Sequence, residues 1–73
     1  MRDMDRFEHA AHCFSQATEI QPGKEVYTLL ASVELEINPT QALKSADKAL
    51  LYDKNWEEAI EIKNEAKRRM AVD

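Results

Sequence analysis

The strongest constraint on this chain is its scarcity of residues that allow tight turns. Its 73 residues include one glycine and two prolines, and these fall at only two places, Pro22-Gly23 and Asn38-Pro39. A protein built from strands needs turn residues more often than this. The sequence therefore predicts a single all-α domain, with a third break at residues 53–55. The four predicted helices cover about residues 5–20, 24–37, 39–53 and 55–71.

Apolar residues recur at three- and four-residue steps, as one face of an α-helix requires. In the first segment this stripe comprises Phe7, Ala10, Ala11, Phe14, Ala17 and Ile20. The second segment is apolar over a wider arc, which is typical of a helix packed on two sides. A buried strand is the competing interpretation of residues 26–33. The chain offers no second strand to pair with it, so the helical interpretation is preferred.

Side chains that can cap helices precede the predicted starts. The residues predicted to act as caps are Asp3 or Asp5, Asn38 with Gln41, and Asn55 with Glu58. The last helix carries acids in its early turns and bases in its final turn, which suits the helix dipole, and Glu65 and Arg69 stand four residues apart as an ion pair. Trp56, beside the third break, is predicted to cover the end of the core, with a partner contact as the alternative.

A pattern of small residues occurs twice, 32 residues apart. Ala10, Phe14, Ala17 and Pro22 align with Ala42, Ala46, Ala49 and Lys54. Small side chains let two antiparallel helices approach closely, and a larger residue can fill the gap between them. The sequence therefore predicts helical hairpins packed one on the next.

This pattern resembles the tetratricopeptide repeat family, in which a unit of about 34 residues forms two helices. In that family an aromatic residue, a leucine and a small residue mark the first helix, and Tyr27, Leu30 and Ala31 match them. A small residue, an aromatic residue and another small residue, in that order, mark the second helix of the repeat. Ala10, Phe14 and Ala17 match this order. The later copy departs from this pattern, because Ala46 stands where an aromatic residue is usual and Lys54 where a proline is usual.

The resemblance covers about residues 6–70. It implies the second helix of one repeat, a complete repeat and a closing helix, stacked as a short right-handed superhelix. This arrangement is expected either as a domain of its own or as a piece of a longer array.

The resemblance also implies a function, since members of the family bind a peptide or protein segment on a concave face lined by first helices. It predicts a non-catalytic adaptor or scaffold module. The expected partner contacts are Glu25, Thr28, Ser32, Leu35, Ile60, Asn64 and Lys67. One branch of the family grips a carboxylate with basic and asparagine residues on successive helices. Here Thr28 and Ser32 occupy those places in the complete repeat and only Asn64 matches, so Thr28 and Ser32 could equally be plain solvated positions.

Two alternatives to this interpretation stay open. The first helix lacks its usual hairpin partner, so Phe7, Ala11 and Phe14 could present apolar surface through which two copies associate. A simple four-helix bundle is the other alternative. In a bundle the first and fourth helices touch, whereas in a stack each helix mainly contacts its sequence neighbours.

The sequence offers little support for catalysis or metal binding. His9, His12 and Cys13 form one cluster, but a structural zinc site needs four ligands, which only a site shared between two chains could supply. No phosphate-binding glycine loop or nucleophile with an oxyanion site is present. We therefore expect no enzyme activity, no cofactor and no resident metal.

Charge and hydropathy restrict the class of partner. The net charge is −4 and the pI about 5.1, which argues against nucleic acid, since its binding needs a basic surface. The basic residues near the C-terminus are too few and too mixed with acids to change this. No stretch approaches the roughly 18 apolar residues of a membrane span, and no signal peptide is evident. A cytoplasmic protein that binds other proteins is expected.

Overall fold

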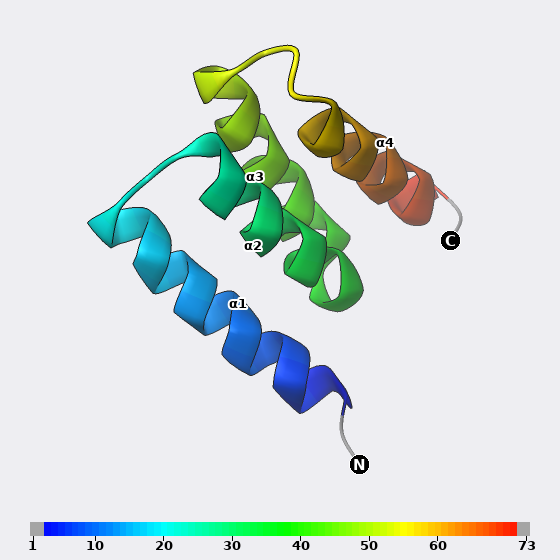
Figure 1. The fold of residues 1–73 in the computed structure, drawn as a ribbon. Coiled ribbons are helices and arrows are strands. Elements are labelled where there is room, and N and C mark those ends of the chain that lie inside the picture. Colours follow the sequence, from blue (N-terminus) through cyan, green and yellow to red (C-terminus); the bar gives the residue numbers. More distant parts are fainter. Residues whose placement is uncertain (1–2, 72–73) are drawn as a thin grey trace.

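Four helices joined by short turns make up the fold. The computed structural model describes the backbone of residues 3–71 and the side chains of residues 6–71. The helices are α1 (Asp3–Ile20), α2 (Lys24–Ile37), α3 (Pro39–Tyr52) and α4 (Glu57–Ala71). They run alternately up and down in a flat arrangement of 35 × 30 × 14 Å (Figure 1). The predicted all-α class and the number of helices are confirmed.

The helices pack in the order in which they follow one another in the sequence. Each helix contacts its neighbour along the chain, and α2 additionally contacts α4. Over residues 3–71, α1 touches neither α3 nor α4. A closed bundle needs its first and last helices in contact, so the bundle alternative is wrong. The arrangement is an open stack of hairpins.

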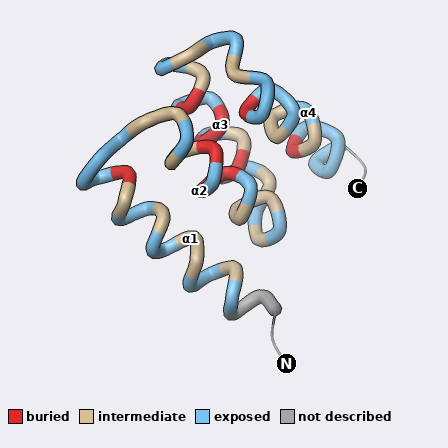
Figure 2. The backbone as a smooth tube through the Cα atoms, viewed as in Figure 1, coloured by how far each residue is buried: buried red, intermediate tan, exposed pale blue. Residues whose placement is uncertain are grey.

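Alanines form the centre of the core. Ala31 of α2, Ala46 and Ala49 of α3, and Ala59 of α4 are completely buried and lie together in one cluster. Larger side chains pack around this cluster while remaining partly exposed: Tyr27, Leu50, Trp56 and Ile62. Buried positions line the inner sides of α2, α3 and α4 in Figure 2. The small residues predicted to bring α3 close to its neighbours therefore do so.

The turns follow from local chemistry. Pro22 follows the end of α1, and Gly23 precedes α2 in an extended conformation that any residue could adopt. Asn38 ends α2 and starts α3, because its backbone N–H donates to Glu34 O at 2.6 Å and its side chain accepts from Thr40 N at 3.1 Å. The predicted Asn38 cap is thus confirmed. Gln41 does not complete a capping box, since the Asn38 N–H already has a partner.

The predicted start of the last helix, at residue 55, is two residues too early. In the structure α4 begins at Glu57, and the capping box of Asn55 with Glu58 is wrong. Asp53 organises this turn instead: its side chain accepts from Asn55 N at 3.1 Å, and its backbone oxygen accepts from Trp56 N at 3.0 Å. Trp56 packs against the alanine cluster, as expected of a residue covering the end of the core.

Helix α1 is the least buried helix. Thr18 is its only buried side chain among residues 6–20, and the hydroxyl of Thr18 donates to Ser15 O at 2.6 Å. The predicted caps Asp3 and Asp5 lie outside the described side chains. Because α1 contacts α2 alone, Phe7, Ala10, Ala11, Phe14 and Ala17 are only half-covered, and Ile20 is 84% exposed.

The close approach of the helices can be tested by enlarging one core alanine. Ala46 is 0% exposed and sits among other alanines, so Ala46→Leu should lower the free energy of unfolding by roughly 1–3 kcal/mol through overpacking. Urea titration followed by circular dichroism measures the change. Lys44→Leu, at an exposed position of the same helix, is the control and should change it by less than about 0.5 kcal/mol. Equal stability of the two variants would contradict the close packing.

Candidate functional site

A shallow groove lies along α4, beside the C-terminal half of α2. It encloses about 370 Å³. Leu35 contributes from α2, and α4 contributes Glu61, Ile62, Asn64, Glu65 and Arg68. Apolar side chains from both helices are thus bordered by an amide and by charges of both signs. Such a mixture can hold an apolar side chain while fixing the orientation of the polar groups around it.

One end of the α2–α4 pair is fixed by Trp56. Its indole Nε1–H donates to Thr28 Oγ1 at 2.7 Å, and the Thr28 hydroxyl donates in turn to Lys24 O at 2.6 Å. The Lys24 ammonium lies 4.2 Å from the centre of the tryptophan ring. This cation–π contact and the hydrogen bonds hold the start of α4 against the start of α2.

An ion pair strengthens the same end. Lys24, at the start of α2, donates through Nζ to Oδ2 of Asp53, which lies in the turn between α3 and α4, at 2.8 Å. This hydrogen bond lowers the pKa of Asp53, assisted by the backbone N–H of Asn55, and raises the pKa of Lys24. Both shifts favour the charged forms of the two groups.

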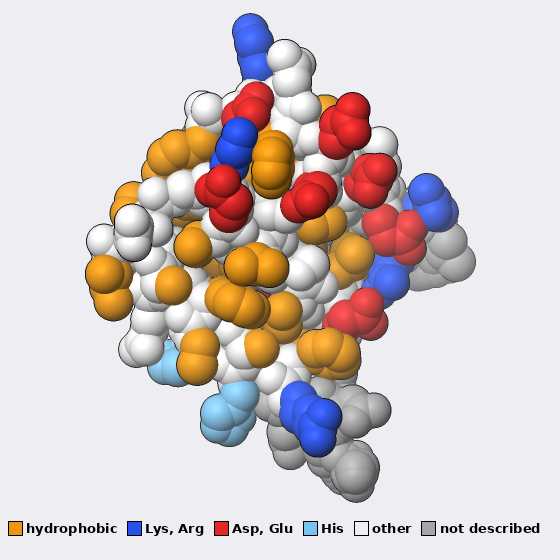
Figure 3. Space-filling model, in the orientation of Figure 1, with side chains coloured by type: hydrophobic (Ala, Val, Ile, Leu, Met, Phe, Trp, Pro, Cys, Tyr) orange, Lys and Arg blue, Asp and Glu red, His pale blue; other side chains and the backbone are white. Residues whose placement is uncertain are grey.

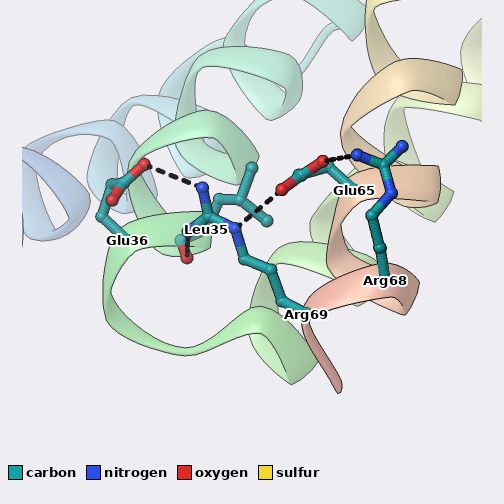
Figure 4. A network of polar contacts seen from close by, with 5 residues as sticks. All are labelled: Leu35, Glu36, Glu65, Arg68 and Arg69. Carbon is teal, nitrogen blue, oxygen red and sulfur yellow. Dashed lines mark hydrogen bonds and ion pairs between the residues drawn. The ribbon is translucent and has the colours of Figure 1, made fainter. Parts of the chain in front are cut away.

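Arg69 fixes the opposite end of the pair. Its side chain reaches from the last turn of α4 to the end of α2, where it donates to Leu35 O at 3.0 Å and lies 3.5 Å from Glu36 (Figure 4). Glu65 accepts from Arg69 at 3.0 Å, as the four-residue spacing predicted, and also from Arg68 at 2.6 Å. The hydrogen bond from Arg69 lowers the pKa of Glu65. The groove therefore lies between two polar links that set the spacing of its walls.

The structure brings together only part of the predicted partner surface. Leu35 and Asn64 both line the groove. Glu25, Ser32, Ile60 and Lys67 are exposed on the same two helices without lining it. The Ser32 hydroxyl donates to Leu29 O at 2.8 Å.

Thr28 is placed differently from the prediction. It is only 6% exposed, and its hydroxyl is used by Lys24 and Trp56. The helical spacing put it correctly on the side of α2 that meets α4. The spacing could not show that the indole of Trp56 would cover it. Thr28 is therefore not a solvated position but part of the polar link between α2 and Trp56.

Four groove residues were not predicted as contacts: Glu61, Ile62, Glu65 and Arg68. Three- and four-residue steps from Asn64 lead to Glu61 and Arg68, so the spacing on α4 contained a signal for them. The sequence predicts Glu65 only as the ion-pair partner of Arg69, and Arg68 only as a base that suits the helix dipole. In Figure 3, acidic side chains gather over the α4 side of the visible face, and hydrophobic side chains occupy its centre.

The N-terminal helix carries the remaining predicted residues. Phe7, Ala11 and Phe14 are half-buried, so they are neither fully covered nor free. Cys13 is an exposed thiol. His9 and His12 share a shallow hollow with Glu8, and the described part of the chain contains no group of three side chains able to hold a metal ion.

A second cavity, of about 480 Å³, opens between α1 and α3. It shares no lining residue with the groove, and no pattern in the sequence predicts it. Its floor includes Glu34 of α2, whose carboxylate accepts a hydrogen bond from the buried Ser45 hydroxyl at 2.6 Å. Burial raises the pKa of Glu34, against the opposing effects of Ser45 and Lys48.

Comparisons with known proteins add no relative. No family model matches the chain, and searches of curated proteins and of solved structures find no match. Among the described helices, none is both long enough and apolar enough to cross a bilayer.

The Lys24–Asp53 pair predicts a specific dependence of stability on pH. Because the folded pKa of Asp53 lies below the ordinary 3.8, the contribution of the pair is present above pH 3.8 and is lost as the pH falls through the folded value. The pKa of Lys24 is raised above 10.5, so the contribution is also lost as the pH rises past the folded value of that group.

Urea midpoints measured across this pH range test the prediction. Asp53→Asn removes the ion pair, so the losses of stability that the pair causes at low pH and at high pH should both disappear in this variant. Glu58→Gln removes an exposed carboxylate that has no ion pair among the described residues, and should keep both losses. Parallel pH profiles for Asp53→Asn and the wild type would contradict the assignment.

Proposed function

We propose that this chain is a non-catalytic protein-interaction module, and that the groove between α2 and α4 holds a segment of a partner protein. The observation that supports this best is the convergence of Leu35 with Ile62 and Asn64 in a groove whose walls are fixed at both ends. The expected role is that of an adaptor or scaffold.

A short right-handed superhelix of the tetratricopeptide type is the finer form of this proposal. In such a stack α2 and α4 are first helices of successive repeats and line the same concave face, with α3 behind them. The open order of contacts and the alanines shared by α2, α3 and α4 support this arrangement. The sequence resemblance supports it independently.

The groove lining indicates what the ligand contains. Leu35 and Ile62 suit an apolar side chain, and the Asn64 amide can both donate and accept hydrogen bonds along an extended backbone. Glu61 is exposed and has no ion pair among residues 6–71, so it is available to a basic residue of the ligand. An apolar residue next to a lysine or arginine fits these features.

Selection from a displayed library of random peptides tests the groove directly. We expect selected peptides to combine an apolar and a basic residue. Asn64→Trp should weaken their binding by at least roughly tenfold, the equivalent of about 1.4 kcal/mol, by filling the groove. Gln16→Trp adds the same bulk at an exposed position of α1 and should leave binding unchanged. Unaltered binding to Asn64→Trp would place the ligand elsewhere.

Self-association through α1 is a second candidate function. It is favoured by one observation: α1 contacts α2 alone and leaves Phe7, Ala11 and Phe14 only half-covered. A second copy could cover this stripe in the position where a further helix would pack. The two proposals use different surfaces and can both hold.

Sedimentation at several protein concentrations tests the second candidate. If two copies pair through α1, the wild type should dimerise as the concentration rises, and Phe7→Asp should remain a monomer because a carboxylate cannot be buried there without cost. Gln16→Asp introduces the same charge at an exposed position of α1 and should still dimerise. Circular dichroism of each variant checks that it is folded. A wild type that stays monomeric at high concentration rules the candidate out.

A further inference from the structure

The cavity between α1 and α3 has the features of a binding site. The two helices flank α2 but make no contact with each other within the described residues, so a space of about 480 Å³ remains over α2. That volume lies in the range of small-ligand sites, which is roughly 300–1,000 Å³. Most of its lining is polar, in contrast to the alanine cluster on the other side of α3.

At its floor lies the carboxylate of Glu34, which accepts one described hydrogen bond. Ser45, itself only 7% exposed, donates to one oxygen of Glu34 at 2.6 Å, and no other described group donates to the second oxygen. Lys48 also lines the cavity and favours the charged form of Glu34 electrostatically, although the two side chains form no ion pair. A partly buried anion with one hydrogen bond is under-compensated, and burial correspondingly raises its pKa.

Two aromatic rings also line this cavity, about two helical turns from the Glu34–Ser45 pair. Tyr27 and Tyr52 are stacked with ring centres 5.8 Å apart, and both line the cavity. Lys48 Nζ lies 5.9 Å from the centre of the Tyr27 ring, so this wall already attracts one cation within the chain. Tyr52 is 54% exposed at the edge of the cavity, where a further cation can stack.

The fold does not require the charge of Glu34. A glutamine could accept the same hydrogen bond from Ser45 without the cost of burying an anion. Because the pKa is raised, the ionised form lowers stability once the pH exceeds the ordinary value of 4.5. A charge kept at a cost to stability, inside a cavity with an aromatic wall, is typical of a functional group.

We propose that this cavity is a second docking site, distinct from the α2–α4 groove, and that it receives the guanidinium group of an arginine side chain from a partner protein. The guanidinium pairs with the second oxygen of Glu34, and the tyrosine wall of the cavity offers aromatic rings against which the arginine side chain can pack. Arginine fits better than lysine, since its planar group can stack on a ring and donate two hydrogen bonds to a carboxylate at once, and is the more weakly hydrated cation.

The test uses two blocked amino acids that differ in charge. The folded chain, labelled with ¹⁵N, is titrated at pH 7 with N-acetyl-L-arginine amide and, separately, with N-acetyl-L-citrulline amide, which has nearly the same shape but no charge. We expect the arginine probe alone to shift the backbone amides around Tyr27, Glu34, Ser45 and Tyr52.

Substitution of the carboxylate provides the decisive comparison. Glu34→Gln should weaken the binding of the arginine probe by roughly tenfold, as expected for the loss of a charge-assisted hydrogen bond. Glu58→Gln makes the same charge change at an exposed position of α4 and should bind as the wild type does. At pH 7 Glu34→Gln should be at least as stable as the wild type, so weaker binding would not reflect unfolding.

Several results would overturn the inference. They are the absence of shifts with the arginine probe, equal shifts with citrulline, unchanged binding to Glu34→Gln, and shifts confined to the α2–α4 groove. The groove is tested separately by Asn64→Trp, so failure of one site does not imply failure of the other.

Discussion

The close contact of α2, α3 and α4 through alanine is the interaction on which the rest of the structure depends. With no side chain beyond Cβ, these residues allow the three backbones to approach, and no larger side chain of the described residues is completely buried. Bulky residues are therefore displaced to the rim, where Tyr27, Trp56 and Ile62 remain partly exposed. A core of this kind gains its stability from many short contacts between helices. It also leaves aromatic and polar groups at the edges, which is where both candidate sites lie.

Because the core is thin, polar links determine how α2 and α4 face each other. Trp56 and Lys24 hold one end, and Arg69 holds the other, leaving the groove between them. Exposed ion pairs contribute little to stability individually. Here the polar links set the relative positions of the helices, because each link joins residues that are far apart in the sequence. The same links explain why Thr28 is buried and not a solvated position.

The local sequence predicted those features that depend on a single turn or on one face of one helix. The breaks at Pro22 and Asn38, the cap by Asn38 and the pair of Glu65 with Arg69 follow from residues within a few positions of one another. The error at Asn55 shows the limit of such reasoning, since Asp53, with a side chain of similar capping ability, lay two residues away. Of the predicted contacts, Leu35 and Asn64 reach the groove because both lie on helix faces that meet.

The sequence by itself determined four helices, their approximate ends and the small residues along which they pack, since these depend on periodicity and on residue size. Only the tertiary structure decided that α1 stays apart from α3, that the cavity between them contains Glu34, and that the Trp56 indole covers Thr28. These features depend on where each helix crosses the next and how far it extends beyond the crossing. Such relations arise between residues about 10 to 30 positions apart, and no local pattern of spacing encodes them.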